Sequence, residues 1–126
     1  MGGVFFRSAD PAKTVAWYER HLGIQQREYE GQGSAHVLEY DPTGESEVSG
    51  YTVWSVFHED DAYFDPTTQP FMINYRVDDL DALLERLRAD GVEIHAGPDE
   101  WFNGRFAWIH DVDGRKIELW EPSEGH

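Results

Sequence analysis

One carboxylate near the end of the chain is surrounded by aromatic residues at spacings that bring their side chains together. Residues 104–122 read Gly-Arg-Phe-Ala-Trp-Ile-His-Asp-Val-Asp-Gly-Arg-Lys-Ile-Glu-Leu-Trp-Glu-Pro, in which two alternating runs flank an Asp-Val-Asp-Gly turn. This pattern predicts a β-hairpin. Because successive side chains of a strand point to opposite faces, Ile117 and Leu119 take one face, and Glu118 and Trp120 take the other.

Three further side chains join Glu118 and Trp120 if Trp108 pairs with Glu118 across the turn. Directly opposed residues of an antiparallel pair point the same way, so this register adds Trp108, Phe106 and His110 to the face. A carboxyl group in apolar surroundings has a raised pKa and can act as a general base, a metal ligand or an anchor for positive charge. The alternative is a solvent-facing Glu118 on a strand with one polar face.

Composition limits the classes of function. The chain has 126 residues, which suits one domain, and it has no cysteine, which excludes thiol catalysis and zinc–thiolate sites. The formal charge of −15 disfavours nucleic acid and anionic membranes as partners. The first residues lack a leader pattern and no apolar run approaches a membrane span, so we expect a cytoplasmic protein. Aromatic residues at 14% indicate an aromatic pocket or interface.

The first half of the chain predicts the order β-α-β-β-β. Asp10 and Pro11 provide a helix start, Gly23 a helix end, and Val15, Tyr18 and Leu22 a buried stripe between them. The expected elements are strands at 4–8, 25–30, 35–40 and 51–57, a helix from 10 to about 21, a turn at 41–44 and an acidic insertion at 45–50.

The second half predicts the same order. A strand at 71–77 leads to a helix at about 80–89, whose leucines fall at positions 80, 83, 84 and 87. A strand at 92–95 and the terminal hairpin follow. The shared landmarks predict two similar modules, at about 1–60 and 71–122, which are joined by a linker at 58–70 within a single domain.

Three stretches carry a family resemblance. They are Asp-Pro-Ala-Lys-Thr-Val-Ala-Trp-Tyr-Glu-Arg-His-Leu-Gly from residue 10, Tyr-Arg-Val-Asp-Asp-Leu-Asp-Ala-Leu from residue 75, and Asp-Val-Asp-Gly-Arg-Lys-Ile-Glu-Leu-Trp from residue 111. In this order they resemble the vicinal oxygen chelate superfamily, which includes glyoxalases, bleomycin resistance proteins and extradiol dioxygenases. The resemblance implies an α+β fold in which two βαβββ modules form a curved sheet around a cavity, often in a homodimer.

The resemblance also implies metal ligands on the first and fourth strands of each module. The internal repeat places these positions at Gly3, Trp54, Met72 and Glu118, of which Glu118 alone suits a hard cation. A one-residue shift to Val53 or Ser55 restores no strong ligand. His110 lies diagonal to Glu118, and His36 and His58 are the other histidines that could reach the cavity. We therefore expect no resident cofactor, with a divalent metal at Glu118 as the alternative.

Strand parity gives the predicted ligand-binding wall. Its members are Phe5, Arg7, Trp54, Met72, Asn74, Phe106, Trp108, His110 and Trp120, with Trp101 added from a lid predicted at 97–105. Arg7 has an alternative role, because it can pair with acids at the end of its strand. Trp101 has one too, because it can cover the core.

Two functions fit these residues. The first is a binding protein, in which Glu118 anchors a cationic or aromatic small molecule among the tryptophans. The second is a divalent-metal-dependent lyase, isomerase or dioxygenase, in which Glu118 is the catalytic residue, as metal ligand or general base. We also expect a homodimer, because an edge strand at 25–30 needs cover.

Overall fold

A computed structural model describes residues 2–24, 35–39 and 51–124 of the chain. Its elements are β1 (Gly3–Ser8), α1 (Pro11–Leu22), β2 (Ala35–Glu39), β3 (Tyr51–His58), the 3₁₀ turn η1 (Ala62–Phe64), β4 (Phe71–Arg76), α2 (Leu80–Ala89), β5 (Ile94–Trp101), β6 (Gly104–His110) and β7 (Lys116–Pro122). The strand predicted at 25–30, the turn at 41–44, the insertion at 45–50 and the side chain of His36 lie outside the described residues. The homodimer stays a prediction.

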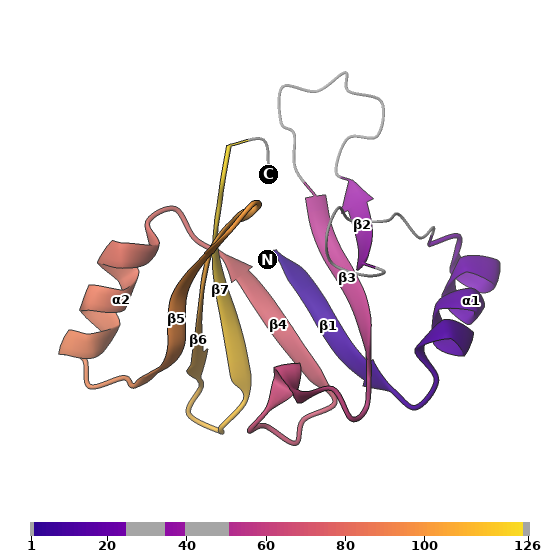
Figure 1. The fold of residues 1–126 in the computed structure, drawn as a ribbon, viewed down its shortest axis with the longest axis horizontal. Coiled ribbons are helices and arrows are strands. Elements are labelled where there is room, and N and C mark those ends of the chain that lie inside the picture. The colour runs from indigo at the N-terminus through magenta and orange to yellow at the C-terminus, as the bar shows by residue number, and fades with distance from the viewer. Residues whose placement is uncertain (1, 25–34, 40–50, 125–126) are drawn as a thin grey trace.

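The described strands form one sheet in the order β2-β3-β1-β4-β7-β6-β5. In each module the first strand pairs in parallel with the last, β1 with β3 and β4 with β7. The antiparallel pair β1–β4 joins the two modules at the middle of the sheet, and the two helices lie at opposite ends of the molecule (Figure 1). The predicted α+β fold of two related modules is therefore confirmed.

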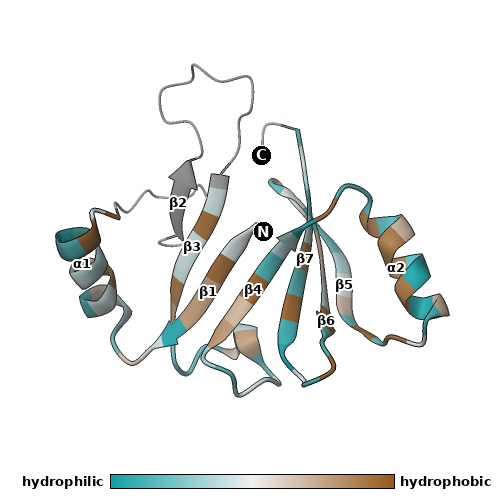
Figure 2. Ribbon diagram, turned by 180° about the vertical axis from the view of Figure 1, so that it is seen from behind, coloured by the Kyte–Doolittle hydropathy of each residue, from teal (hydrophilic) through white to brown (hydrophobic). Residues whose placement is uncertain are grey.

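Helix α2 forms as the leucine spacing predicts. Asp79 caps its N-terminus by accepting a hydrogen bond from the backbone N–H of Ala82. Leu80 and Leu84 are fully buried against one face of the second module, where they meet Ala107, Ile109, Leu119 and partly buried neighbours. Figure 2 shows the matching alternation of hydrophobic and hydrophilic residues along β7. We call this the outer face of the sheet and the opposite face, without helices, the inner face.

Helix α1 packs less tightly than predicted. Asp10 and Gly23 cap it as expected, with Gly23 in the left-handed conformation at φ 69°. Tyr18 packs on the rings of Phe6 and Trp54 at centroid distances of 6.0 and 4.8 Å, but it is only half-buried. Leu22 is 61% exposed, so the prediction that it is buried was wrong. It is the last residue of the helix, beyond the positions that meet the sheet.

Most of the segment predicted as a lid loop, 97–105, is strand, so the loop conformation was wrong. Residues 94–101 form β5 and pair with β6, with register shifts around residues 96–99. Gly97 permits this irregular pairing: its φ is 90°, and an added Cβ would lie 2.6 Å from the carbonyl oxygen of Phe106. Trp101 lies at the tip of the β5–β6 hairpin and is 53% exposed. A paired strand cannot move as a loop does without losing its ladder of hydrogen bonds.

The linker does more than connect the modules. Within it, η1 carries Phe64, which is 0% exposed, and Tyr63, whose ring joins the inner-face cluster. That cluster also contains Phe5, Met72, Phe106, Trp108 and Trp120. The inner face is therefore filled at its centre by side chains that come from between the modules. No described helix is long and apolar enough to cross a membrane.

The packing of α2 can be tested by truncating its most buried side chain. Leu84→Ala should lower the free energy of unfolding by about 2–5 kcal/mol, because a buried leucine leaves a cavity. Glu85→Ala, at an exposed position of the same helix, should change it by less than about 0.5 kcal/mol. Urea denaturation of the two variants measures the difference. Equal losses would mean that the leucine stripe does not hold α2 to the sheet.

Candidate functional site

The terminal hairpin has the predicted register. Trp108 pairs with Glu118, Phe106 with Trp120, and His110 with Lys116. Ile117 and Leu119 pack toward α2 in the outer-face core, so Glu118 points to the inner face. The hypothesis of a solvent-facing Glu118 is wrong, because its side chain lies under other residues and only 2% of it is exposed.

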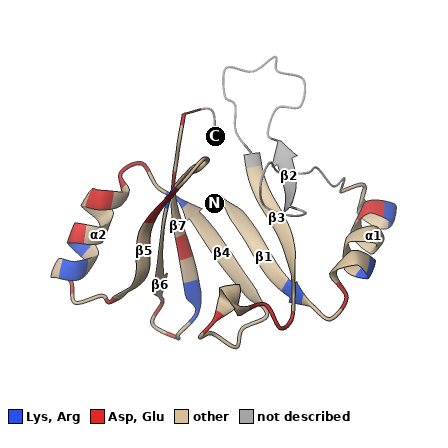
Figure 3. Ribbon diagram, viewed as in Figure 1, with Lys and Arg blue, Asp and Glu red and all other residues tan. Residues whose placement is uncertain are grey.

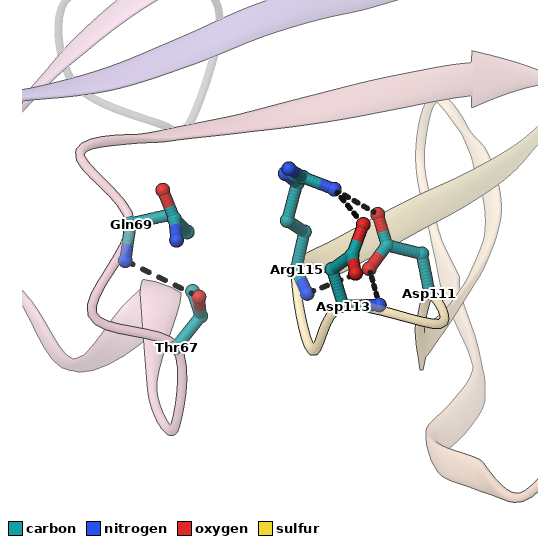
Figure 4. Close-up of polar contacts among 5 residues, drawn as sticks. All are labelled: Thr67, Gln69, Asp111, Asp113 and Arg115. Carbon is teal, nitrogen blue, oxygen red and sulfur yellow. Dashed lines mark hydrogen bonds and ion pairs between the residues drawn. The ribbon is translucent and has the colours of Figure 1, made fainter.

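The turn between β6 and β7 fixes this register. Asp111 accepts hydrogen bonds from the backbone N–H groups of Asp113 and Arg115, both at 2.9 Å (Figure 4). The Arg115 guanidinium bridges the two carboxylates, at 3.2 Å from Asp111 and 2.9 Å from Asp113. Gly114 supplies the positive φ of 82° that such a turn requires. A slip by one residue would turn Glu118 to the outer face.

Trp54 does not belong to the inner face. It pairs with Val4 across the parallel β1–β3 ladder, and its ring lies 5.1 Å from that of Phe6 on the side of α1. The residues of β3 that share the inner face are Val53, Ser55 and Phe57. The alignment of the two modules that placed Trp54 opposite Glu118 was wrong by one residue. Because side chains alternate along a strand, a shift of one residue moves a side chain to the opposite face of the sheet.

The other predicted wall residues lie on the inner face, except Trp101 at the exposed hairpin tip. Gly3 and Glu118 are both direct partners of Asn74, which is 3% exposed. Phe5 and Met72 pair with each other two residues along β1 and β4 from the Gly3–Asn74 pair. The rings of Phe106 and Trp120 stack at 6.1 Å, and those of Phe106 and Trp108 at 6.4 Å, as expected of an aromatic wall. All three rings are under 10% exposed, so the wall is covered.

Glu118 is held by a residue that sequence reasoning did not find. The hydroxyl of Tyr63 donates a hydrogen bond to Oε1 of Glu118 at 2.8 Å. Burial raises the pKa of the Glu118 carboxyl from 4.5 to about 7, although Tyr63, the Asn74 amide and the Lys116 ammonium each lower it. Oε2 of Glu118 is buried and makes no hydrogen bond of good geometry, although the Asn74 amide lies close enough to lower the pKa of the carboxyl. The carboxyl is thus partly ionised near pH 7, with one oxygen engaged and one free.

Lys116 adds a second charge that had not been assigned to the site. It is 9% exposed, and its Nζ donates to the carbonyl oxygen of Tyr63 at 2.7 Å and lies over the rings of Tyr63 and Trp108. Burial lowers the pKa of this lysine. Figure 3 shows the adjoining basic and acidic segments of β7. The signal was in the sequence, since Lys116 lies two residues before Glu118. Tyr63 gave no such signal, because no periodicity orients a linker residue.

Arg7 and His110 lie at the margin of the site. Arg7 donates to the carbonyl oxygen of Thr67 at 3.2 Å, lies 3.9 Å from the Asp65 carboxylate and stacks on the Phe64 ring. Arg7 therefore holds the linker in place. This agrees with the alternative role predicted for it, in which it pairs with acids at the end of its strand. The rings of His110 and His95 are 5.0 Å apart, and burial, His95 and Lys116 lower the pKa of His110.

The described residues do not fit a divalent metal centre. They contain no group of three or more His, Cys, Asp and Glu side chains that could hold an ion. Around Glu118 the inner face offers the amide of Asn74, the thioether of Met72 and the ammonium of Lys116, and this last group repels a cation. Two of the four expected ligand positions, Gly3 and Met72, have no hard donor, and Trp54 faces away.

Comparison with known proteins agrees with the topology. Residues 2–119 match the model of the Glyoxalase/Bleomycin resistance protein/Dioxygenase superfamily. The chain belongs to this superfamily. A comparison with curated protein sequences found no significant match.

Several solved structures share the superfamily fold of this chain. Methylmalonyl-CoA epimerase from Mycobacterium tuberculosis is 26% identical over 96% of this chain and 86% of that one, with a TM-score of 0.58. The Streptomyces coelicolor methylmalonyl-CoA epimerase in complex with 2-nitronate-propionyl-CoA is 20% identical over 98% and 96%, with a TM-score of 0.64. A structure described as NAD-dependent benzaldehyde dehydrogenase from Legionella pneumophila is 14% identical over 96% and 98%, with a TM-score of 0.60.

The burial of Glu118 predicts a specific pH dependence of stability. In the unfolded chain the carboxyl loses its proton near pH 4.5, whereas the folded chain keeps it until about pH 7. The folded state therefore binds more protons in this window, and Glu118 makes stability fall as pH rises. The free energy of unfolding of Glu118→Gln, relative to that of the wild type, should therefore rise by on the order of 3 kcal/mol as the pH increases from 4.5 to 7.

Urea denaturation at several pH values measures this gain. Ile117→Val, a substitution without a titratable group on the same strand, serves as the control and should stay parallel to the wild type. A difference between Glu118→Gln and the wild type that does not change with pH would show that Glu118 titrates normally.

Proposed function

We propose that this chain binds a small organic molecule on the inner face of its sheet, with the Glu118 carboxyl as the anchor. The observation that carries the proposal is the free Oε2 of a buried carboxyl group. Burying an acceptor without a partner costs free energy, and a ligand that donates a hydrogen bond to Oε2 would remove this cost.

The surroundings of Glu118 define what such a ligand needs. It carries an N–H or O–H donor for Oε2 and an apolar or aromatic part for the ring stack of Phe106, Trp108 and Trp120. The indole Nε1 of Trp108 is buried beside the Tyr63 hydroxyl without a hydrogen bond of good geometry, and it can donate to a ligand acceptor that takes the place of that hydroxyl. Lys116 offsets the negative charge of Glu118, so a neutral donor suits the site as well as a cation.

Glu118→Gln tests the anchor. The substitution keeps the size of the side chain and removes its charge, so it should weaken ligand binding by about 1.5–3 kcal/mol, the scale of a hydrogen bond to a charged group. The measurement is calorimetric titration of a ligand found by thermal-shift screening of the wild type. Glu121→Gln, at a partly exposed position on the same strand, is the control and should bind as the wild type does. Equal affinities of the wild type and Glu118→Gln for every ligand found would refute the proposal.

A second candidate function is proton transfer by an isomerase. It is favoured by the pKa of about 7 at Glu118, which suits a general base at neutral pH, and by the 26% identity to methylmalonyl-CoA epimerase. In this reaction Oε2 would take a proton from a carbon atom next to a carbonyl group and leave an enolate. Epimerisation is completed when a proton reaches the opposite face of that carbon from a second donor, such as water. The described residues do not fit a metal, so no step is assigned to one.

Deuterium exchange tests this second function. Methylmalonyl-CoA incubated with the wild type in D₂O should gain deuterium at the acidic carbon, as measured by mass spectrometry. Glu118→Gln should reduce the rate by about 10²–10⁴-fold, which is the usual contribution of a general base. Exchange no faster than in buffer would leave binding as the function that the site supports.

A further inference from the structure

The ring of Tyr63 sits on the inner face as a bound aromatic molecule would. It stacks on Phe57 with an interplanar angle of 3° at 5.3 Å, and it meets the edge of Trp108 at 88° and 6.3 Å. The ammonium of Lys116 lies 5.6 Å above its centre. Its hydroxyl donates to Glu118 at 2.8 Å. The ring of Phe5 lies 6.3 Å away as a third aromatic contact. Three ring contacts, a cation and a carboxylate acceptor together form a complete recognition site for a phenol.

Tyr63 does not belong to either module. It lies in η1, and its neighbours Asp61, Ala62, Asp65 and Pro66 are exposed. No strand pairing includes this segment. It is anchored by the side chain of Phe64, which is fully buried in the inner-face cluster. Polar contacts add the Lys116 bond to the Tyr63 carbonyl oxygen, the Arg7 bond to the Thr67 carbonyl oxygen, and local turn bonds such as that from the Tyr63 N–H to the Asp61 carboxylate. Because Tyr63 is only partly buried and takes part in no strand pairing, its ring can turn away about its own side-chain torsions while Phe64 and the sheet stay in place.

We infer that the natural ligand of this chain carries an aromatic ring with an O–H or N–H donor, and that this ring replaces Tyr63 against Glu118. The inference rests on the proposed binding function and names the class of ligand. The linker thus competes with the ligand from within the chain. When the Tyr63 ring is in place, its hydroxyl donates to Oε1 of Glu118. When the ring is displaced, the site is open to the ring of the ligand. Oε2 stays free with Tyr63 in place, so a ligand with a second donor gains a bond that Tyr63 does not make.

The test uses 4-methylphenol, the side chain of tyrosine as a free molecule, and toluene as its analogue without a hydroxyl. The wild type should bind 4-methylphenol weakly, and Tyr63→Ala should bind it at least about tenfold more tightly, because the competitor is gone. Tyr63→Ala should also prefer 4-methylphenol to toluene, and adding Glu118→Gln should reduce that preference. Calorimetry gives the affinities.

Phe64→Ala is the matched control. Phe64 is fully buried in the same turn and contacts the ring of Phe57, but it makes no contact with Glu118. Its removal should create a cavity that takes 4-methylphenol and toluene equally. If Tyr63→Ala also binds 4-methylphenol and toluene with equal affinity, the Glu118 carboxylate does not select a ligand with a donor, and the inference fails.

Tyr63→Phe covers the case in which Tyr63→Ala does not fold. It keeps the ring and loses only the bond to Glu118, so it should bind 4-methylphenol several-fold more tightly than the wild type. An unchanged affinity overturns the inference, as does a wild type that binds no 4-methylphenol at millimolar concentration. NMR separates this inference from the proposed function. If a different ligand needs Glu118 for binding but leaves the Tyr63 resonances unchanged, this inference is overturned and the proposed function stands.

Discussion

The hydrogen bond between Tyr63 and Glu118 links the segment between the modules to the last strand of the sheet. A second contact supports it, since Lys116, two residues before Glu118 on β7, donates a hydrogen bond to the backbone carbonyl oxygen of Tyr63. Through these contacts the linker covers the aromatic stack and excludes water from the carboxyl group. The raised pKa of Glu118 follows from that exclusion. Without the linker in place, Glu118 would be an ordinary acid on an open sheet.

Charge at this site differs from charge over the whole chain. The protein carries a formal −15, yet Glu118, the most buried acid among the described residues, lies close to the buried Lys116, whose positive charge lowers its pKa. The neighbours of Glu118 lower its pKa but do not overcome the effect of burial. A buried carboxyl in this state can accept or supply a proton near neutral pH. The same property serves ligand anchoring and proton transfer, which is why both functions depend on one residue.

Superfamily membership sets the architecture and leaves the chemistry to the site. The two modules pair β1 with β4 and present their first and last strands to the inner face, where family enzymes place their metal ligands. In the described part of this chain the expected ligand positions hold Gly3, Met72 and Glu118, and the fourth position, corrected by one residue from Trp54, holds Ser55. Similar folds therefore carry different sites, and the function has to be argued from the side chains that are present.

Local patterns in the sequence were enough for the elements that depend on local physics. The leucine spacing predicted α2, the caps at Asp10 and Gly23 predicted α1, and the Asp-Val-Asp-Gly turn with its alternating flanks predicted the β6–β7 register that turns Glu118 inward. These features involve residues close in sequence, whose geometry follows from helical and strand periods. The family resemblance added the pairing of the two modules.

Tertiary structure decided everything that depends on contacts between distant segments. The face of Trp54 required the register of β1 with β3, residues about fifty apart, and the repeat placed it one residue out. The strand at 97–101 required pairing with β6, which a loop-like composition with Gly97 and Pro98 concealed. The role of Tyr63 required the linker to fold back over β7, fifty-five residues away. No period relates such positions, because burial of aromatic rings and of a carboxyl group is a property of the assembled inner face and not of any one strand.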